Sequence, residues 1–262
     1  MNITPINKKL VEQSFKKSID TYNNQAFVQD EICSKLLDVL IEKSGTNFKN
    51  VFEIGAGTGL LTQKLINRCT IDSIVLNDLV PAMSESLLAI GNSVKTLDCS
   101  FIAGDAESIT LPSNCNLIVS TSTFQWFEDL SSFFEKVWNA LSDDGIFAFS
   151  TFGPDNLMEV KMIEGNSLSY PTLVELSQLL SKKFDIIYLK EEYIKTHFKS
   201  PKDILQHMKQ TGVNGIESSR WTKKDLLHFT DAYQQYSESE NSYPLTYHPV
   251  YAICKKHKQE DK

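Results

Sequence analysis

The chain has 262 residues, a length that suits one α/β domain with an appended piece, and 41% of them are hydrophobic, as in an ordinary soluble globular protein. Its formal net charge of -7 argues against nonspecific nucleic-acid binding, because no overall positive field attracts phosphates. The five scattered cysteines form no C-x-x-C pair and no zinc-ligand spacing with histidine, so we expect free thiols and no metal site. Because we find neither a signal-peptide core nor an apolar run that spans a bilayer, we expect a cytoplasmic protein that does not enter a membrane.

Apolar residues recur at helical spacing from about Asn7 to Lys43, and the polar run Asp20–Asn24 predicts a break. We therefore expect an N-terminal helical cap over residues 1–45. Strands and helices then alternate, which predicts a mostly parallel sheet covered on both faces. The expected strands lie near 50–54, 73–77, 98–102, 116–120 and 145–151, with helices near 59–68, 81–90 and 130–141.

A glycine-rich turn follows the first expected strand. Gly55, Gly57 and Gly59 stand two residues apart after the acidic Glu53, whereas a dinucleotide fingerprint would need a glycine in place of Leu60. Glycines let the backbone adopt positive φ and let a ligand approach the main chain. The pattern resembles the first motif of class I S-adenosylmethionine (SAM)-dependent methyltransferases, whose loop lies along the methionine end of SAM. An ordinary glycine-rich βα turn is the alternative.

Acidic residues follow the next two expected strands. Asp78 lies about 20 residues beyond the glycines, the spacing at which a carboxylate reaches ribose hydroxyls, although it also suits a helix N-cap and the neighbouring Asn77 is an alternative. In the methyltransferase pattern, the position of Asp105 reaches the adenine amino group and the backbone of Ala106 touches the ring. A solvated turn is the other interpretation of this segment.

The fourth expected strand ends at Ser120, and its carboxyl end should face the reacting methyl group. The aromatic residues Phe124, Trp126 and Phe127 that follow either wall off the methyl donor or form a packing cluster.

The last third departs from strict alternation. We expect a helix near 172–182, a strand near 184–195, a mostly helical section over 200–240 and a final strand near 246–254. The whole chain, 1–262, then forms a single domain in which 200–240 is a helical lid inserted before the last strand.

Several segments indicate a particular family within this fold class. Phe15 and Tyr22 near the N-terminus, together with the segments 124–127, 149–157, 205–214 and 243–248, resemble the malonyl-[acyl-carrier protein] O-methyltransferases of biotin synthesis. The resemblance runs from about Lys8 to Cys254. It implies a seven-stranded Rossmann-like class I methyltransferase sheet, mostly parallel with the last strand antiparallel, carrying N-terminal helices and a helical insertion between strands six and seven.

The resemblance also implies methyl transfer from SAM to the free carboxylate of a malonyl thioester on acyl-carrier protein, or on CoA, giving the methyl ester that primes biotin synthesis. A carboxylate is ionised at neutral pH, so the reaction needs orientation and a dry site rather than a base. Catalytic candidates are Tyr22, Lys209, Tyr247 and His248, and substrate-binding candidates are Phe124, Trp126, His207 and Arg220. Solvated helix faces are the alternative for the two cations, and packing roles for the two histidines.

The partner of such an enzyme is an acidic carrier protein, and residues 199–224 contain six basic and two acidic side chains. This section is therefore a candidate docking face, although surface lysines often only solvate helices. Two rival functions stay open: a SAM-dependent methyltransferase for another small carboxylate or hydroxyl, and a SAM-binding protein without catalysis. The sequence leaves the oligomeric state open.

Overall fold

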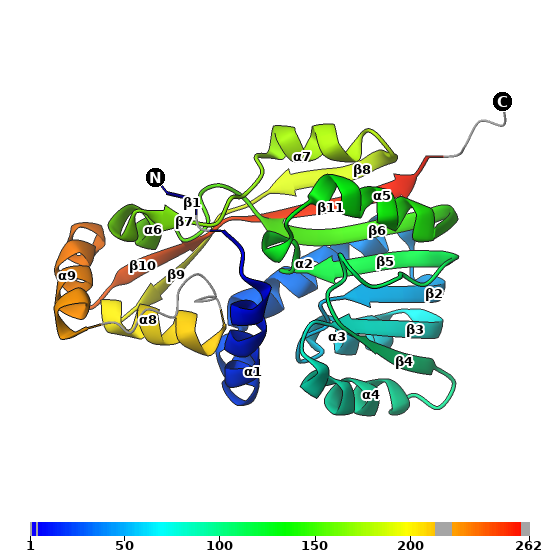
Figure 1. The fold of residues 1–262 in the computed structure, drawn as a ribbon, viewed down its shortest axis with the longest axis horizontal. Coiled ribbons are helices and arrows are strands. Elements are labelled where there is room, and N and C mark those ends of the chain that lie inside the picture. Colours follow the sequence, from blue (N-terminus) through cyan, green and yellow to red (C-terminus); the bar gives the residue numbers. More distant parts are fainter. Residues whose placement is uncertain (1, 4, 213–221, 258–262) are drawn as a thin grey trace.

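A computed structural model describes residues 2–3, 5–212 and 222–257 of the chain. Its centre is the predicted seven-stranded sheet, in the order β4-β3-β2-β5-β6-β11-β8 (Figure 1). Only the last strand in the chain runs antiparallel to its neighbours, as expected. The strands are β2 (Asn47–Ile54), β3 (Thr70–Asp78), β4 (Asp98–Ala103), β5 (Cys115–Thr121), β6 (Leu141–Phe152), β8 (Phe184–Glu191) and β11 (Pro249–Lys256).

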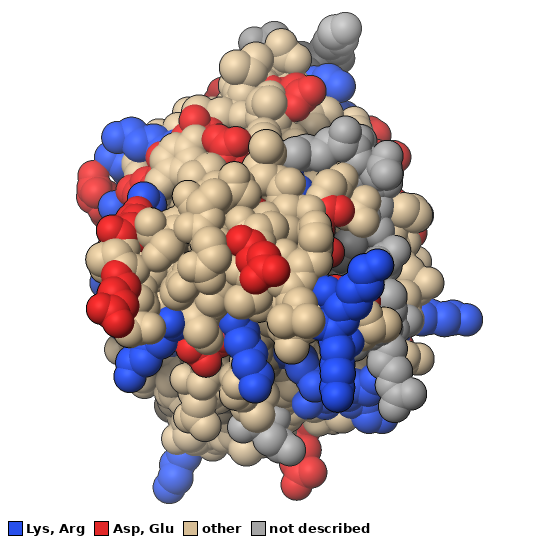
Figure 2. Space-filling model, turned by 90° about the vertical axis from the view of Figure 1, so that its left-hand side faces the viewer, with Lys and Arg blue, Asp and Glu red and all other residues tan. Residues whose placement is uncertain are grey.

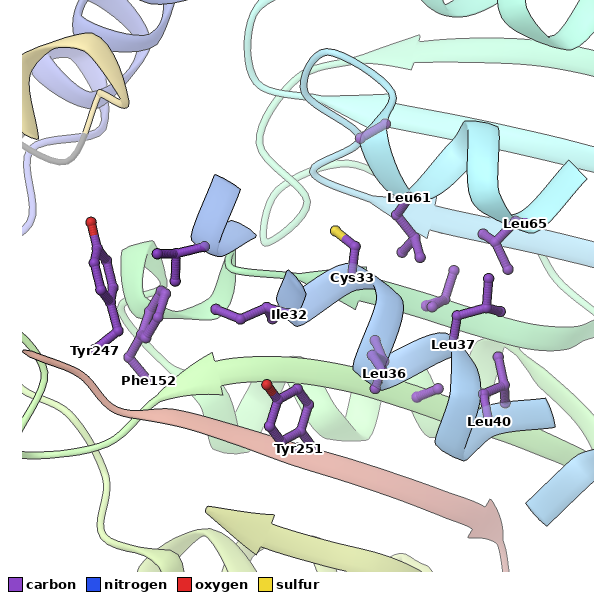
Figure 3. Packing of buried hydrophobic residues seen from close by; sticks show 14 of the residues in the cluster. Ile32, Cys33, Leu36, Leu37, Leu40, Leu61, Leu65, Phe152, Tyr247 and Tyr251 are labelled. Atoms are coloured by element: carbon purple, nitrogen blue, oxygen red, sulfur yellow. The ribbon is translucent and has the colours of Figure 1, made fainter. Parts of the chain in front are cut away.

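Helices cover both faces of this sheet, because its central strands are apolar on both sides. One face packs against α2 (Phe27–Ser44), α3 (Leu60–Arg68) and α4 (Ser84–Asn92). The other packs against α5 (Leu130–Ala140) and α7 (Leu173–Leu180). Figure 3 shows part of the first of these layers, in which Leu36, Leu37 and Leu40 of α2 belong to the same packed cluster as Leu61 and Leu65 of α3.

The N-terminal helices are confirmed, but the break between them lies at Ala26 rather than at 20–24. α1 (Lys8–Gln25) begins where the Asn7 side chain accepts a hydrogen bond from the backbone of Leu10, and it continues through the polar run that suggested a break. In Figure 1, α1 stands across the carboxyl ends of the central strands, between the sheet and α8 (Pro201–Gln210).

The insertion before the last strand is larger than expected. The predicted strand 184–195 is two strands, β8 and β9 (Ile194–Phe198), and the predicted strand 246–254 is likewise β10 (Tyr243–Tyr247) followed by β11. β9 and β10 pair with each other antiparallel, outside the main sheet. Together with α8, α9 (Lys223–Tyr233) and the 3-10 turn η3 (Gln234–Tyr236), they form a separate layer at the left of Figure 1.

Five short elements complete the described chain. α6 (Met158–Glu164) packs against α9 and β10, and β1 (Asn2–Ile3) pairs with β7 (Asn166–Ser167). The 3-10 turns η1 (Pro81–Met83) and η2 (Phe124–Trp126) follow β3 and β5.

Candidate active site

A cleft of about 830 Å³, including its solvent-open mouth, lies beyond the carboxyl ends of β2, β3, β4 and β5. The chain order of the strands reverses between β2 and β5, the place where open α/β sheets bind ligands. α1 forms one wall of the cleft with the residues Lys8, Val11, Phe15, Ser18, Ile19 and Tyr22.

The glycine turn requires glycine for two different reasons. Gly55 has φ 67°, and a Cβ there would lie 2.2 Å from Oγ1 of Thr123. Gly57 has φ 56°, but a Cβ there would have nothing within 4 Å, because this residue faces the cleft. Gly59 does not line the cleft. It begins α3 in the left-handed conformation and packs against Ile90.

Asp78 lies at the cleft wall and is 8% exposed. Its carboxylate accepts hydrogen bonds from the backbone N–H groups of Gly57 and Val80, each at 2.8 Å. Burial raises the pKa of Asp78, and these two hydrogen bonds oppose that shift. Asn77 also lines the cleft, and its amide donates to the carbonyl groups of Ile102 and Gly104. Asp78 therefore holds the glycine turn in place while keeping acceptor capacity for a ligand.

At the other end of the cleft, Lys8 of α1 pairs with Asp105, at 2.6 Å, and with Glu107. Asp105 and the buried Ala106, the two residues predicted for the adenine end, both line the cleft. Lys8 also lies over the ring of Phe127. The far end of α1 contacts the glycine turn, where the Thr58 hydroxyl donates to Oδ1 of Asn23 at 2.5 Å. α1 therefore bridges the two ends of the cleft.

Glu53 and Ser120 lie beneath the turn and do not line the cleft. Glu53 is 1% exposed and accepts a hydrogen bond from the Thr62 hydroxyl at 2.8 Å. Burial raises the pKa of its carboxyl group to about 8, so it holds its proton at pH 7. The Ser120 hydroxyl donates to the carbonyl of Ile54. Both side chains support the carboxyl ends of β2 and β5 rather than contacting a ligand directly.

A second cavity of about 400 Å³, including its solvent-open part, adjoins the first, and we call it the acceptor chamber. Phe15, Tyr22, Ser122 and Trp126 line both cavities, so the two meet at these residues. The rest of the acceptor chamber is lined by Gln29, Gln125, Phe152, Asn156, Leu168, Tyr170, Thr211 and Tyr247.

The acceptor chamber contains buried polar atoms without a hydrogen-bond partner. They are Oε1 of Gln29, Oγ of Ser122, Oε1 of Gln125 and Nε1 of Trp126. Leaving a buried polar group unpaired costs about 1–3 kcal/mol. Four such atoms around one cavity are therefore characteristic of a site that receives a polar ligand.

Tyr247 and His207 form a hydrogen-bonded pair behind this cavity. The Tyr247 hydroxyl lies 2.7 Å from Nε2 of His207, and Figure 3 shows it pointing away from the packed leucines. His207 does not itself line either cavity. It is enclosed by the rings of Phe27 and Phe198, and burial lowers its pKa to about 4. Burial also raises the pKa of Tyr22 and of Tyr247, so all three groups are neutral at pH 7.

The remaining predicted residues lie elsewhere. Phe124 packs in the aromatic cluster on the α5 face of the sheet, and Lys209 is exposed on α8. His248 is buried and does not line the acceptor chamber: Nδ1 accepts from the backbone of Asp155, Nε2 is 3.2 Å from Glu191, and the ring stacks on Tyr193. Arg220 lies outside the described residues.

Sequence reasoning missed several residues that line the two cavities. Lys8 is one basic residue in a lysine-rich helix, and only the fold reveals its two acidic partners. Gln29 lies inside the expected N-terminal helical cap, whereas Ser122 and Gln125 follow the expected strand that ends at Ser120. The position of Ser122 directly after β5 was the available signal.

Within residues 2–3, 5–212 and 222–257, no group of three or more His, Cys, Asp or Glu side chains is placed to hold a metal ion. The five cysteines are free thiols, as predicted. None of the helices in this part of the chain has both the length and the apolarity needed to cross a membrane.

Comparison with known proteins places these features in a family. A methyltransferase domain model matches residues 52–149. The chain is 38% identical to a malonyl-[acyl-carrier protein] O-methyltransferase of Bacteroides thetaiotaomicron, covering 97% of this chain and 100% of that protein. It is also 38% identical to a Bacteroides fragilis protein of the same name, of which it spans 52%. The fold is similar to the N-methyltransferase NodS of Bradyrhizobium japonicum bound to S-adenosyl-L-homocysteine, with a TM-score of 0.57 at 14% identity over 95% of this chain and 99% of that one.

Proposed function

We propose that this chain, which belongs to the malonyl-[acyl-carrier protein] O-methyltransferase family, transfers a methyl group from SAM to the free carboxylate of a malonyl thioester on an acyl-carrier protein. The product is the malonyl methyl ester that primes biotin synthesis. The observation that carries this proposal is the pairing of a glycine-walled cleft with an adjoining polar chamber at Tyr22, Ser122 and Trp126.

The cleft residues fit SAM. Gly57 leaves its wall open to a ligand, Asp78 offers carboxylate oxygens for ribose hydroxyls, and Asp105 with Ala106 would hold the adenine end. When bound, SAM supplies a sulfonium methyl group: the acceptor oxygen forms the new carbon–oxygen bond, the carbon–sulfur bond breaks with its electron pair left on sulfur, and no proton moves. The chain contributes orientation, which is worth up to about 7–11 kcal/mol in favourable intramolecular reactions.

The aromatic wall of the junction keeps water away from the reacting atoms. The rings of Phe15 and Trp126 meet edge to face at 6.0 Å, and Phe15 also packs against Tyr22. A dry site favours a reaction in which a carboxylate and a sulfonium lose their charges together. Tyr22, and Tyr247 with its partner His207, would orient the acceptor through neutral groups, and we keep Tyr22 and Tyr247 as proposed site residues.

The decisive experiment offers several acceptors to the purified protein with labelled SAM. Malonyl-carrier protein, malonyl-CoA, free malonate and a small alcohol are compared, and each product is measured by mass. We expect a gain of one methyl group on the malonyl moiety of the carrier-bound substrate. Methylation of only the alcohol or of free acids would support the rival methyltransferase, and SAM binding without any methylated product would support the non-catalytic reading.

For the carrier protein we propose a docking face on α1, α8 and α9. Eight lysines on or beside these helices are exposed and form no ion pair or hydrogen bond with another described residue. The eight are Lys9, Lys16, Lys17, Lys199, Lys202, Lys209, Lys223 and Lys224. Figure 2 shows basic side chains gathered on the lower part of the face that contains α8 and α9. A locally basic surface on an acidic chain would steer an acidic partner toward the acceptor chamber.

The docking face is tested by reversing charge. Lys202→Glu with Lys209→Glu should raise KM for malonyl-carrier protein and reduce its dependence on salt, while malonyl-CoA, if accepted, is used as before. The matched control is Lys49→Glu with Lys95→Glu, two exposed lysines elsewhere on the chain. Equal effects of the two pairs would rule out this face.

A further inference from the structure

The junction of the two cavities is built by the segment after β5. Ser122 and Trp126 both come from it, and both line the cleft and the acceptor chamber. Trp126 is 7% exposed, and its indole N–H is buried without a partner. The hydroxyl of Ser122 is likewise buried and unpaired. Two hydrogen-bond donors therefore stand unused where the cavity for the methyl donor meets the cavity for the acceptor.

Ser122 is held in this position against its backbone preference. Its φ is 51°, in the left-handed region that a residue with a Cβ rarely adopts. Its N–H donates to the carbonyl of Ser150 at 3.1 Å, and its carbonyl accepts from Nε2 of Gln125 at 2.6 Å. Backbone conformations of this kind persist when the surroundings fix them, and they concentrate at functional sites.

The acceptor chamber is uncharged. Each of its lining side chains that the structure describes is apolar, hydroxyl, amide, phenol or indole. Lys8, the lysine that lines the adjoining cleft, is bound to Asp105 and Glu107 at the far end. Neutral donors orient a carboxylate through hydrogen bonds, and they leave more charge on its nucleophilic oxygen than a paired cation would.

We propose that the Ser122 hydroxyl and the Trp126 indole N–H bind the acceptor carboxylate and aim one of its oxygens into the cleft. This inference rests on the proposed function. It assigns the carboxylate to a neutral binding site, whereas the sequence had suggested Lys209 and His248 as residues that bind it. The methyl ester is a weaker acceptor of hydrogen bonds than the carboxylate, so the same two donors favour substrate over product.

The test uses Trp126→Phe and Ser122→Ala in the full chain. Binding of malonyl-carrier protein and of its methyl ester is measured by calorimetry with S-adenosylhomocysteine present, alongside kcat and KM. We expect each variant to weaken malonyl-carrier binding about 10-fold, the loss of one hydrogen bond to a charged group. Binding of the ester should change less than twofold, and the affinity for S-adenosylhomocysteine, whose cleft both residues also line, should change less than threefold.

Two matched controls contain the same kind of unpaired buried atom away from both cavities. They are Trp138→Phe, which removes an unpartnered indole N–H on α5, and Ser44→Ala at the end of α2. If Trp126→Phe and Ser122→Ala bind the malonyl carrier as these controls do, the inference is overturned. A wild-type protein that forms no methyl ester would instead overturn the proposed function, and the two failures are thereby distinguished.

Discussion

Replacing Asp78 by Asn tests how the cleft holds the cofactor. The Asp78 carboxylate accepts two backbone hydrogen bonds of 2.8 Å, from Gly57 and Val80, and would accept two more from ribose hydroxyls. Asn keeps one oxygen and presents an N–H₂ group in place of the other. That group cannot accept a hydrogen bond from the backbone or from a ribose hydroxyl. A hydrogen bond to a charged group contributes about 1.5–3 kcal/mol, so we expect SAM affinity to fall about 10- to 150-fold.

The stability of the ligand-free protein should change much less. Asn leaves one backbone N–H poorly paired, which costs about 1–3 kcal/mol, but it also removes a carboxylate whose burial is unfavourable, as its raised pKa indicates. These two effects oppose each other, so the affinity loss should stand out in calorimetry while the melting temperature shifts only slightly. Asp72→Asn, at the exposed start of the same strand, is the control. A SAM affinity of Asp78→Asn within threefold of this control would refute the assignment.

Three further predictions follow from the described contacts. Tyr22→Phe should lower turnover about 10-fold, the loss of one hydrogen bond, and leave SAM affinity unchanged; unaltered turnover would remove Tyr22 from the site. Burial raises the pKa of Glu53 to about 8, so the folded protein retains a proton that the unfolded chain releases near pH 4.5. The free energy of unfolding should therefore fall as the pH rises between these two values, by up to about 1.4 kcal/mol per pH unit. Glu53→Gln should flatten this slope in urea unfolding at pH 5 and pH 8, and a slope equal to that of the wild type would contradict the shift. Gly55→Ala should lower the melting temperature and the SAM affinity more than Gly45→Ala. Both positions have positive φ, but only at Gly55 would the new Cβ lie 2.2 Å from another side chain, that of Thr123. Equal losses in the two variants would show that this contact does not matter.

The sequence predicted the sheet well because buried parallel strands are short apolar runs that end in recognisable turns. It predicted the glycine turn and Asp78 for the same reason: their roles depend on spacing along the chain, and the structure places both at one cleft. The acceptor chamber was beyond reach. Its walls come from α1, α2, the segment after β5, the end of β6 and the segment after it, the segment after β7, the end of α8 and β10, and no local pattern indicates that these segments meet.

The error at the end of the chain has one local cause. Residues 246–254 have the composition of a continuous strand, but the ladder partners change at His248, from β9 on one side to β6 and β8 on the other. Tyr247 therefore faces the acceptor chamber, whereas His248 contacts Asp155 and Glu191 and does not line it. Two neighbouring residues that were both catalytic candidates from the sequence thus have separate surroundings.

The pKa shifts of the groups around the acceptor chamber distinguish between a carboxylate and a hydroxyl as the methyl acceptor. A hydroxyl acceptor needs a base whose pKa lies near the working pH. His207 has a pKa lowered to about 4 and is bound through Nε2 to Tyr247, and burial raises the pKa of Tyr22, so none of these groups is poised to take a proton at pH 7. A carboxylate acceptor arrives already ionised and asks only for orientation and a dry surrounding. The buried, neutral donors at the junction supply those two things, and they therefore favour an acid as the methyl acceptor.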